Sequence, residues 1–130
     1  YTKSMNNQQN IENEKMYKLN KQANSDGTSL RGNITVSTKR LTELFGLPSR
    51  SDGYKVSGRY VFTSEAGDVF TLYDWKSTSL YDEKMIAPEE FWNQSFPVTL
   101  NIGAKSTVGV GGFMSFLTTS LRFAESGGAR

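Results

Sequence analysis

The sequence predicts an α+β fold: an antiparallel sheet of four or five strands with two helices, the C-terminal helix packed on one face of the sheet. Two runs rich in β-branched and aromatic residues, 59–63 and 69–75, flank a turn rich in Gly and Asp, which is typical of a β-hairpin. Residues 96–102 alternate apolar and polar side chains, as a half-buried strand does. Near the C-terminus, apolar residues recur at helical spacing.

The polar N-terminal segment sets the first boundary. Residues 1–30 hold long polar runs with few apolar side chains, which predicts a tail or linker. The alternative for this segment is a short helix that docks on a partner. We expect a single domain over residues 31–124, and a flexible tail over residues 125–130, which are small or polar.

A short strand is expected at residues 32–36, followed directly by a helix. Ser37 or Thr38 would cap the helix N-terminus. Gly46 fits the position after the last turn, and Pro48 prevents further helix. The chain then turns, and residues 54–56 are expected to begin the sheet.

Beyond the hairpin, residues 77–84 are polar and predict a loop. Pro88 followed by two acids resembles a first helical turn, because proline fits that position and the helix dipole favours acids there. The final helix is expected to end near Phe123 and to cover the apolar face of the sheet. The residues that define its apolar stripe are Val110, Phe113, Met114, Leu117 and Leu121.

Composition excludes several classes of chemistry. The chain has 130 residues, no Cys and no His, which rules out disulfides, Cys-based zinc sites and every catalytic mechanism that needs a histidine. The net charge of +2, from 15 basic and 13 acidic residues, is lower than duplex-DNA binders usually carry. No apolar run reaches the roughly 18 residues of a membrane span, so no membrane partner is expected.

The segment 103–107 resembles a phosphate-binding loop, since it follows a strand and precedes a helix. That motif needs Gly immediately before the Lys and another Gly five residues earlier, and here Ala104 and Thr99 occupy those positions. Glycines at 109, 111 and 112 leave a weaker anion site open, or serve only a tight turn. No cofactor is predicted.

Asp74-Trp75-Lys76 resembles one half of a metal-dependent nuclease site. Such a site needs a second carboxylate to complete a Mg²⁺ shell. The upstream candidates are Asp52 and Asp68, both in turn contexts where Asp is favoured for local hydrogen bonding. We therefore predict no metal site and no enzymatic activity, and keep a metal-dependent nuclease as an alternative.

The aromatic residues of the hairpin are the main candidates for ligand binding. Aromatic faces on a sheet, bordered by cations, stack unpaired bases. Alternation places Tyr73 and Trp75 on one face, and Phe70 and Leu72 on the other. Aromatics under the C-terminal helix would be core, and those on the opposite face would be candidates for stacking. The predicted nucleic-acid-binding residues are Arg59, Tyr60, Tyr73, Trp75, Lys76 and Lys105.

A second aromatic group follows the hairpin and predicts a protein contact, because clustered aromatics often anchor interfaces. The predicted partner-binding residues are Tyr81, Phe91 and Trp92. Two exposed faces on a small sheet also predict a homo-oligomer.

Three runs, Phe-Gly-Leu-Pro at 45–48, Asp-Gly-Tyr-Lys-Val at 52–56 and Thr-Leu-Tyr-Asp-Trp-Lys at 71–76, resemble a pattern in small phage- and virus-encoded proteins with one α+β domain. The resemblance covers residues 31–103 and implies no catalytic residues. It implies a viral accessory role, which would place the protein in the cytoplasm of a host cell.

The leading hypothesis is a non-enzymatic, oligomeric binding module that contacts single-stranded nucleic acid or a nucleotide through an aromatic sheet face. The first alternative is a protein-interaction or inhibitor domain that acts on a host factor. Salt separates the two, since binding to nucleic acid weakens steeply with salt and a hydrophobic protein contact does not.

Overall fold

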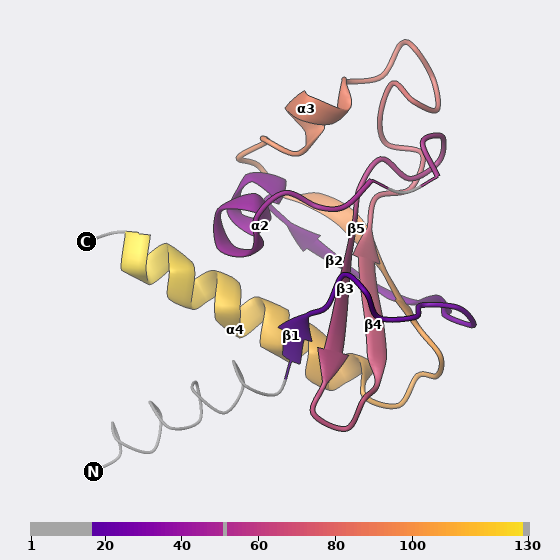
Figure 1. Ribbon diagram of the computed structural model, residues 1–130. Coiled ribbons are helices and arrows are strands. Elements are labelled where there is room, and N and C mark those ends of the chain that lie inside the picture. Colours follow the sequence, from indigo (N-terminus) through magenta and orange to yellow (C-terminus); the bar gives the residue numbers. More distant parts are fainter. Residues whose placement is uncertain (1–16, 51, 129–130) are drawn as a thin grey trace.

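The computed structural model describes residues 17–50 and 52–128, with side-chain environments as far as Arg122. Over these residues the fold is α+β, as predicted: one open five-stranded antiparallel sheet with three helices (Figure 1). In chain order the elements are β1 (Tyr17–Leu19), β2 (Ser29–Val36), α2 (Thr38–Phe45), β3 (Arg59–Ser64), β4 (Val69–Tyr73), α3 (Pro88–Phe91), β5 (Val98–Ala104) and α4 (Val110–Gly128).

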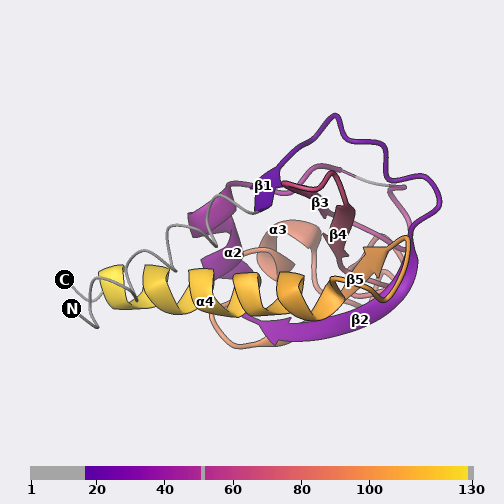
Figure 2. The ribbon, with the colours of Figure 1, turned by 90° about the horizontal axis from the view of Figure 1, so that it is seen from below.

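The strand order is β1-β3-β4-β5-β2, with every neighbouring pair antiparallel. The predicted hairpin is β3–β4, in which Phe62 lies opposite Phe70. Because β1 and β2 lie at opposite edges, their connection, residues 20–28, has to cross the sheet. Figure 2 shows this crossing loop on the side of the sheet away from α4.

The core lies between the sheet and α4. From the sheet, Phe62, Phe70 and Leu72 face the helix and are almost completely buried. Phe113 of α4 stacks on Phe70 with ring centroids 4.8 Å apart. Leu117, one helical turn further, is fully buried as well, so the predicted apolar stripe of the helix forms the centre of the core.

The first described helix, α2, has the ends that the sequence predicts. Ser37 is the N-cap, and its hydroxyl accepts a hydrogen bond from the Arg40 amide. Gly46 adopts a φ of +83°, which costs least for glycine, and donates its amide to the Thr42 carbonyl. The helix lies against α4 and closes one end of the core.

The observed elements differ from the predicted boundaries at several points. Tyr17 belongs to β1 and is buried against Phe70, Phe113 and Phe116, so the polar N-terminal segment supplies an edge strand. Sparse apolar spacing did not predict this, because a three-residue strand needs only one buried side chain. The rest of the expected tail, residues 1–16, lies outside the described part.

Two further boundaries shift. The sheet resumes at Arg59 and not at residues 54–56, which form a bend before it. The backbone of α4 is helical through Gly128, so it extends beyond Phe123 and takes in part of the segment predicted as a flexible tail. Over the described residues, no helix has the length and apolar character needed to cross a membrane.

Candidate functional site

The two faces of β4 carry different environments. Phe70 and Leu72 point into the core, whereas Thr71 and Tyr73 lie on the outer face. The crossing loop covers part of this outer face, and Thr71 is only 2% exposed. At the end of the strand the cover stops, and Trp75 is 46% exposed. The exposed ring of Trp75 therefore lies just past the end of β4.

At this end of the sheet, each of two lysine ammonium groups lies near two of three exposed aromatic rings. Lys55 Nζ lies 5.7 Å from the Trp75 ring centroid and 5.8 Å from that of Tyr54. Lys76 Nζ lies 5.7 Å from the Trp75 centroid and 5.2 Å from that of Tyr81. The Tyr54 and Tyr81 rings are themselves 5.4 Å apart, which closes the group. We call these five residues the aromatic–lysine cluster.

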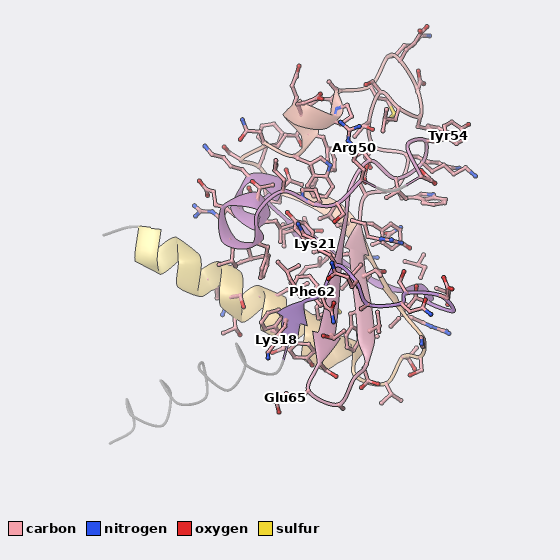
Figure 3. The ribbon with its side chains drawn as sticks, in the orientation of Figure 1. Lys18, Lys21, Arg50, Tyr54, Phe62 and Glu65 are labelled. Atoms are coloured by element: carbon pink, nitrogen blue, oxygen red, sulfur yellow. The ribbon has the colours of Figure 1, made fainter. Side chains whose placement is uncertain are left out.

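The cluster belongs to one end of the molecule. Figure 3 shows the Tyr54 side chain projecting outward from its loop, and Glu65 at the opposite end, on the β3–β4 turn. Tyr54 is 51% exposed and Tyr81 is 38% exposed. All three rings of the cluster are therefore accessible to a ligand from solvent.

A buried carboxylate holds the two halves of the cluster together. Asp74, directly before Trp75, is fully buried and accepts three hydrogen bonds: from the Ser57 amide at 2.8 Å, the Ser57 hydroxyl at 2.7 Å and the Gly58 amide at 3.0 Å. The Lys76 amide donates to the Lys55 carbonyl at 2.6 Å. Hydrogen bonds to a carboxylate are stronger than those between neutral groups, so the Asp74 bonds, together with this backbone bond, fix the loop against the end of β4.

A second aspartate shapes the loop that carries Tyr54 and Lys55. Asp52 Oδ1 accepts the amides of Tyr54 at 2.8 Å and Val56 at 3.0 Å. These backbone hydrogen bonds, with the Val56 amide as the largest contribution, lower the pKa of the Asp52 carboxyl. On the other side of the cluster Lys76 adopts a φ of +55°, which is uncommon for a residue with a Cβ. Both turns thus direct a lysine toward Trp75.

Arg59 and Tyr73 lie on the outer face beside the cluster. They are cross-strand neighbours in the β3–β4 register, and both line a cavity of about 210 Å³ that Trp75 also borders. Burial raises the pKa of the Tyr73 hydroxyl, and a hydrogen bond with Asn101 partly offsets that effect. The predicted binding residues Arg59, Tyr73, Trp75 and Lys76 are therefore brought together.

Two other predicted nucleic-acid-binding residues are not. Tyr60 faces the core, is 3% exposed and donates its hydroxyl to the Gly46 carbonyl at 2.7 Å, so it cannot stack on a base. Lys105 follows β5 at the end of the sheet that holds the β3–β4 turn, because Ala104 lies opposite Phe70. It lines a separate cavity of about 190 Å³ beside Asp68. Both residues therefore lie outside the aromatic–lysine cluster.

The predicted partner-binding residues also separate. Phe91 and Trp92 are 4% and 6% exposed and belong to the core, where Trp92 packs edge-on against Tyr60. The Trp92 indole donates its Nε1 hydrogen to the Ser57 hydroxyl at 2.9 Å. Neither residue presents its ring as an exposed anchor. Tyr81 is exposed, but it belongs to the same cluster as Trp75.

The carboxylates considered for a metal site lie apart. The Asp74 carboxylate is buried, and both of its oxygens accept hydrogen bonds from Ser57 or Gly58. Asp52 accepts from its own turn, and Asp68 lies at the opposite end of the hairpin. In the described part of the chain, no group of three or more acidic side chains is placed to hold a metal ion.

Sequence reasoning missed Tyr54 and Lys55. Their signal is the repeat of an aromatic residue followed by lysine, Tyr54-Lys55 and Trp75-Lys76, each after an aspartate within two residues. The repeat indicates a site only once the fold is known, because the Asp74 carboxylate accepts from Ser57 and Gly58 and so brings the two segments together. No family model matches this sequence and no curated protein matches it, so the site is interpreted from its own chemistry.

Proposed function

We propose that this protein is a non-enzymatic binding module that holds single-stranded nucleic acid at the aromatic–lysine cluster. The observation that carries the proposal is the alternation of three exposed rings with two ammonium groups at 5.2–5.8 Å from the ring centroids. Unpaired bases stack on such rings, with about 1–3 kcal/mol per stacked base, and the lysines neutralise phosphates.

The composition of the cluster favours a single strand over a duplex. Bases in a duplex are stacked on one another and do not offer their faces to protein rings. Duplex binders usually rely on many phosphate contacts, whereas this cluster offers Lys55 and Lys76, with Arg59 nearby. A site with few cations and several rings is typical of single-strand recognition.

The backbone at Lys76 supports the same proposal. A lysine with a φ of +55° is strained by about 1 kcal/mol or more relative to an ordinary conformation. Glycine or asparagine would fit this turn with less strain. A lysine kept in this conformation, with its ammonium directed to Trp75 and Tyr81, is consistent with a role in binding.

A fluorescence titration tests the proposal, because the two tryptophans differ in exposure. Trp92 is buried, so a ligand that stacks on the cluster changes mainly the emission of Trp75. We expect saturable quenching by an oligothymidylate of about ten nucleotides. The affinity should fall with salt, with a log–log slope of about −0.7 for each neutralised phosphate.

Matched variants make this experiment specific. Lys55→Gln and Lys76→Gln should each weaken binding and reduce the salt slope, whereas Lys105→Gln, at the other end of the sheet, should leave both unchanged. Trp75→Phe should remove the quenching signal. Quenching that persists in Trp75→Phe, or binding that is insensitive to both lysine variants, would contradict the proposal.

A second function, a protein-interaction or inhibitor domain, is favoured by a different surface. A cavity of about 380 Å³ lies between α2 and α3 and is bordered by Leu47, Pro48 and the edge of Trp92. Leu47 is 75% exposed. If this surface carries the function, Leu47→Asp should abolish capture of a host protein, and Lys76→Gln should not affect it.

A further inference from the structure

The cavity beside Trp75 lies on the outer face of the sheet, where the crossing loop meets β2. It is bordered by Thr28 at the end of that loop, by Arg59 of β3, by Tyr73 of β4 and by Trp75. Its volume of about 210 Å³ is below the roughly 300–1,000 Å³ of pockets that hold whole small ligands. It therefore fits one ring system better than a complete dinucleotide or cofactor.

Gly103 borders the cavity, and the space that a side chain would take here is filled by the Thr71 hydroxyl. Gly103 lies on β5 opposite Thr71, and a Cβ at this position would collide with the Thr71 hydroxyl and approach the Tyr73 ring to 3.5 Å. The backbone φ here is not unusual for other residues, so conformational freedom does not explain the glycine. What the glycine permits is the close approach of the Thr71 and Tyr73 side chains to the β5 backbone.

One polar group that borders the cavity, the guanidinium of Arg59, has a donor without an acceptor in the described part of the chain. Arg59 is permanently charged, and its Nε is buried with no hydrogen-bond partner in the part of the chain that the structure describes. Among the described residues that line the cavity, none is acidic. A guanidinium in this position gains most from a ligand that brings hydrogen-bond acceptors.

We propose that this cavity is a subsite for one base of the bound strand, and that Arg59 makes it prefer guanine. Guanine presents two acceptors, O6 and N7, on one edge, and the guanidinium fork pairs with both at once. Tyr73 and Trp75 supply aromatic walls for the flat faces of the ring. Adenine presents one acceptor and one donor on the same edge, so it cannot satisfy the fork in this way.

A phosphate group is the other acceptor that arginine commonly binds. Phosphate would leave the Tyr73 and Trp75 rings without a partner. The lining of the cavity therefore favours a base, and phosphate becomes an outcome of the test.

The proposal rests on the proposed function, and the experiment separates the two. Oligothymidylate is compared with the same oligonucleotide carrying one central guanine, by titration of Trp75 fluorescence. We expect about tenfold tighter binding of the guanine-containing strand. Guanosine monophosphate should also quench Trp75 and should compete with the strand, whereas uridine monophosphate and inorganic phosphate at equal concentration should compete much less.

Arg59→Lys is the decisive variant, since it keeps the charge and removes the fork. It should retain binding of oligothymidylate and its salt slope, and lose the preference for guanine. Arg50→Lys, at an exposed position, is the matched control and should behave as the wild type. Denaturation curves of both variants establish that the fold is retained, and Arg59→Gln provides a second substitution if Arg59→Lys does not fold.

The possible outcomes point to different conclusions. Oligothymidylate binding without any preference for guanine overturns the subsite and leaves the proposed function standing. Competition by inorganic phosphate equal to that of guanosine monophosphate shows an anion site and overturns the base assignment. A preference that survives in Arg59→Lys overturns the role of Arg59. Binding of guanosine monophosphate without binding of any strand supports the subsite and contradicts the proposed function.

Discussion

The two tryptophans of this chain lie close to one aspartate and have opposite environments. Trp75 is 46% exposed, with an ammonium group near its ring from each of Lys55 and Lys76. Trp92 is 6% exposed, packs edge-on against Tyr60 and donates its indole hydrogen to Ser57. Trp75 therefore belongs to an exposed surface next to two lysines, and Trp92 belongs to the core.

The two environments are connected. Ser57 accepts from Trp92 and donates to Asp74, which directly precedes Trp75. The core thus positions the surface cluster through two hydrogen bonds and one buried carboxylate. An aromatic residue bordered by polar groups can therefore belong to the surface or to the core. Here the tryptophan that donates to Ser57 is buried, and the one that follows Asp74 is exposed.

Replacing each tryptophan by alanine should separate stability from binding, and gives the largest expected effect. Trp92→Ala should lower the free energy of unfolding by about 3–5 kcal/mol, because it removes a large buried ring and leaves a cavity. Trp75→Ala should lower it by only about 1 kcal/mol, the sum of exposed cation–ring contacts. Urea denaturation measures both.

For binding we expect the opposite order of effects, with the larger loss in Trp75→Ala. Trp75→Ala should abolish the interaction with oligothymidylate, measured by fluorescence anisotropy of a labelled strand. Equal losses of stability in the two variants would contradict the contrast between core and surface.

Asp74→Asn should have the next largest effect, because it breaks the connection between the two regions. The amide keeps the shape of the side chain but offers one acceptor oxygen, where the carboxylate accepts from Ser57 and Gly58 with both oxygens. We expect a loss of about 2–4 kcal/mol in the free energy of unfolding. Affinity for the strand should fall too, although Asp74 touches no ligand.

Asp26→Asn, at an exposed position on the crossing loop, is the matched control and should change stability by less than about 0.5 kcal/mol. If Asp74→Asn unfolds at the wild-type urea concentration and binds normally, Asp74 does not organise the cluster.

Local signals explain what the sequence predicted correctly. The hairpin, the cap at Ser37, the glycine at 46 and the stripe of α4 all depend on residues within a few positions of one another. The fold class follows from such periodicity, because strands and amphipathic helices bury one face each. The placement of Tyr73 and Trp75 on the face opposite Phe70 follows from alternation alone.

The rest depends on long-range contacts that no local pattern encodes. Tyr60 is an exception, because alternation alone puts its side chain on the same face as that of Phe62, which faces the core. Phe91 and Trp92 lack periodicity, and the Trp92 ring is held in the core by Ser57 and Tyr60, more than 30 positions away. Tyr54 entered the site only because the Asp74 carboxylate accepts from Ser57 and fixes the loop.

Tyr60 provides a smaller test of the core side, through pH. Burial raises the pKa of its hydroxyl, so the folded state holds that proton more tightly than the unfolded state does. The resulting stability is fully present below the ordinary tyrosine pKa of about 10 and is lost as the pH rises above it. Burial acts in the same direction on Tyr17 and Tyr73.

We therefore expect urea midpoints to fall above about pH 10, and to fall less steeply in Tyr60→Phe. At neutral pH this variant should lose about 1 kcal/mol, the contribution of the hydrogen bond to Gly46. An identical slope in Tyr60→Phe and the wild type would show that another group causes the alkaline loss.

Lys76→Gly should have the smallest effect on stability and is the sharpest test of the surface side. Glycine relieves the strain at a φ of +55°, which is about 1–2 kcal/mol, but it increases the entropy of the unfolded chain by a comparable amount. The free energy of unfolding should therefore remain equal or rise by up to about 1 kcal/mol. Binding should weaken, since the ammonium between Trp75 and Tyr81 is lost.

Lys76→Asn is the matched control, because asparagine tolerates this conformation and also lacks the charge. Both variants should reduce the salt slope of strand binding by about 0.7, the value of one phosphate contact. A variant that is more stable yet binds more weakly would mean that the strained lysine is kept for binding. Wild-type affinity in Lys76→Gly would instead show that the conformation of this residue serves only the turn. Lys55 would then be the cation with which the cluster binds phosphate.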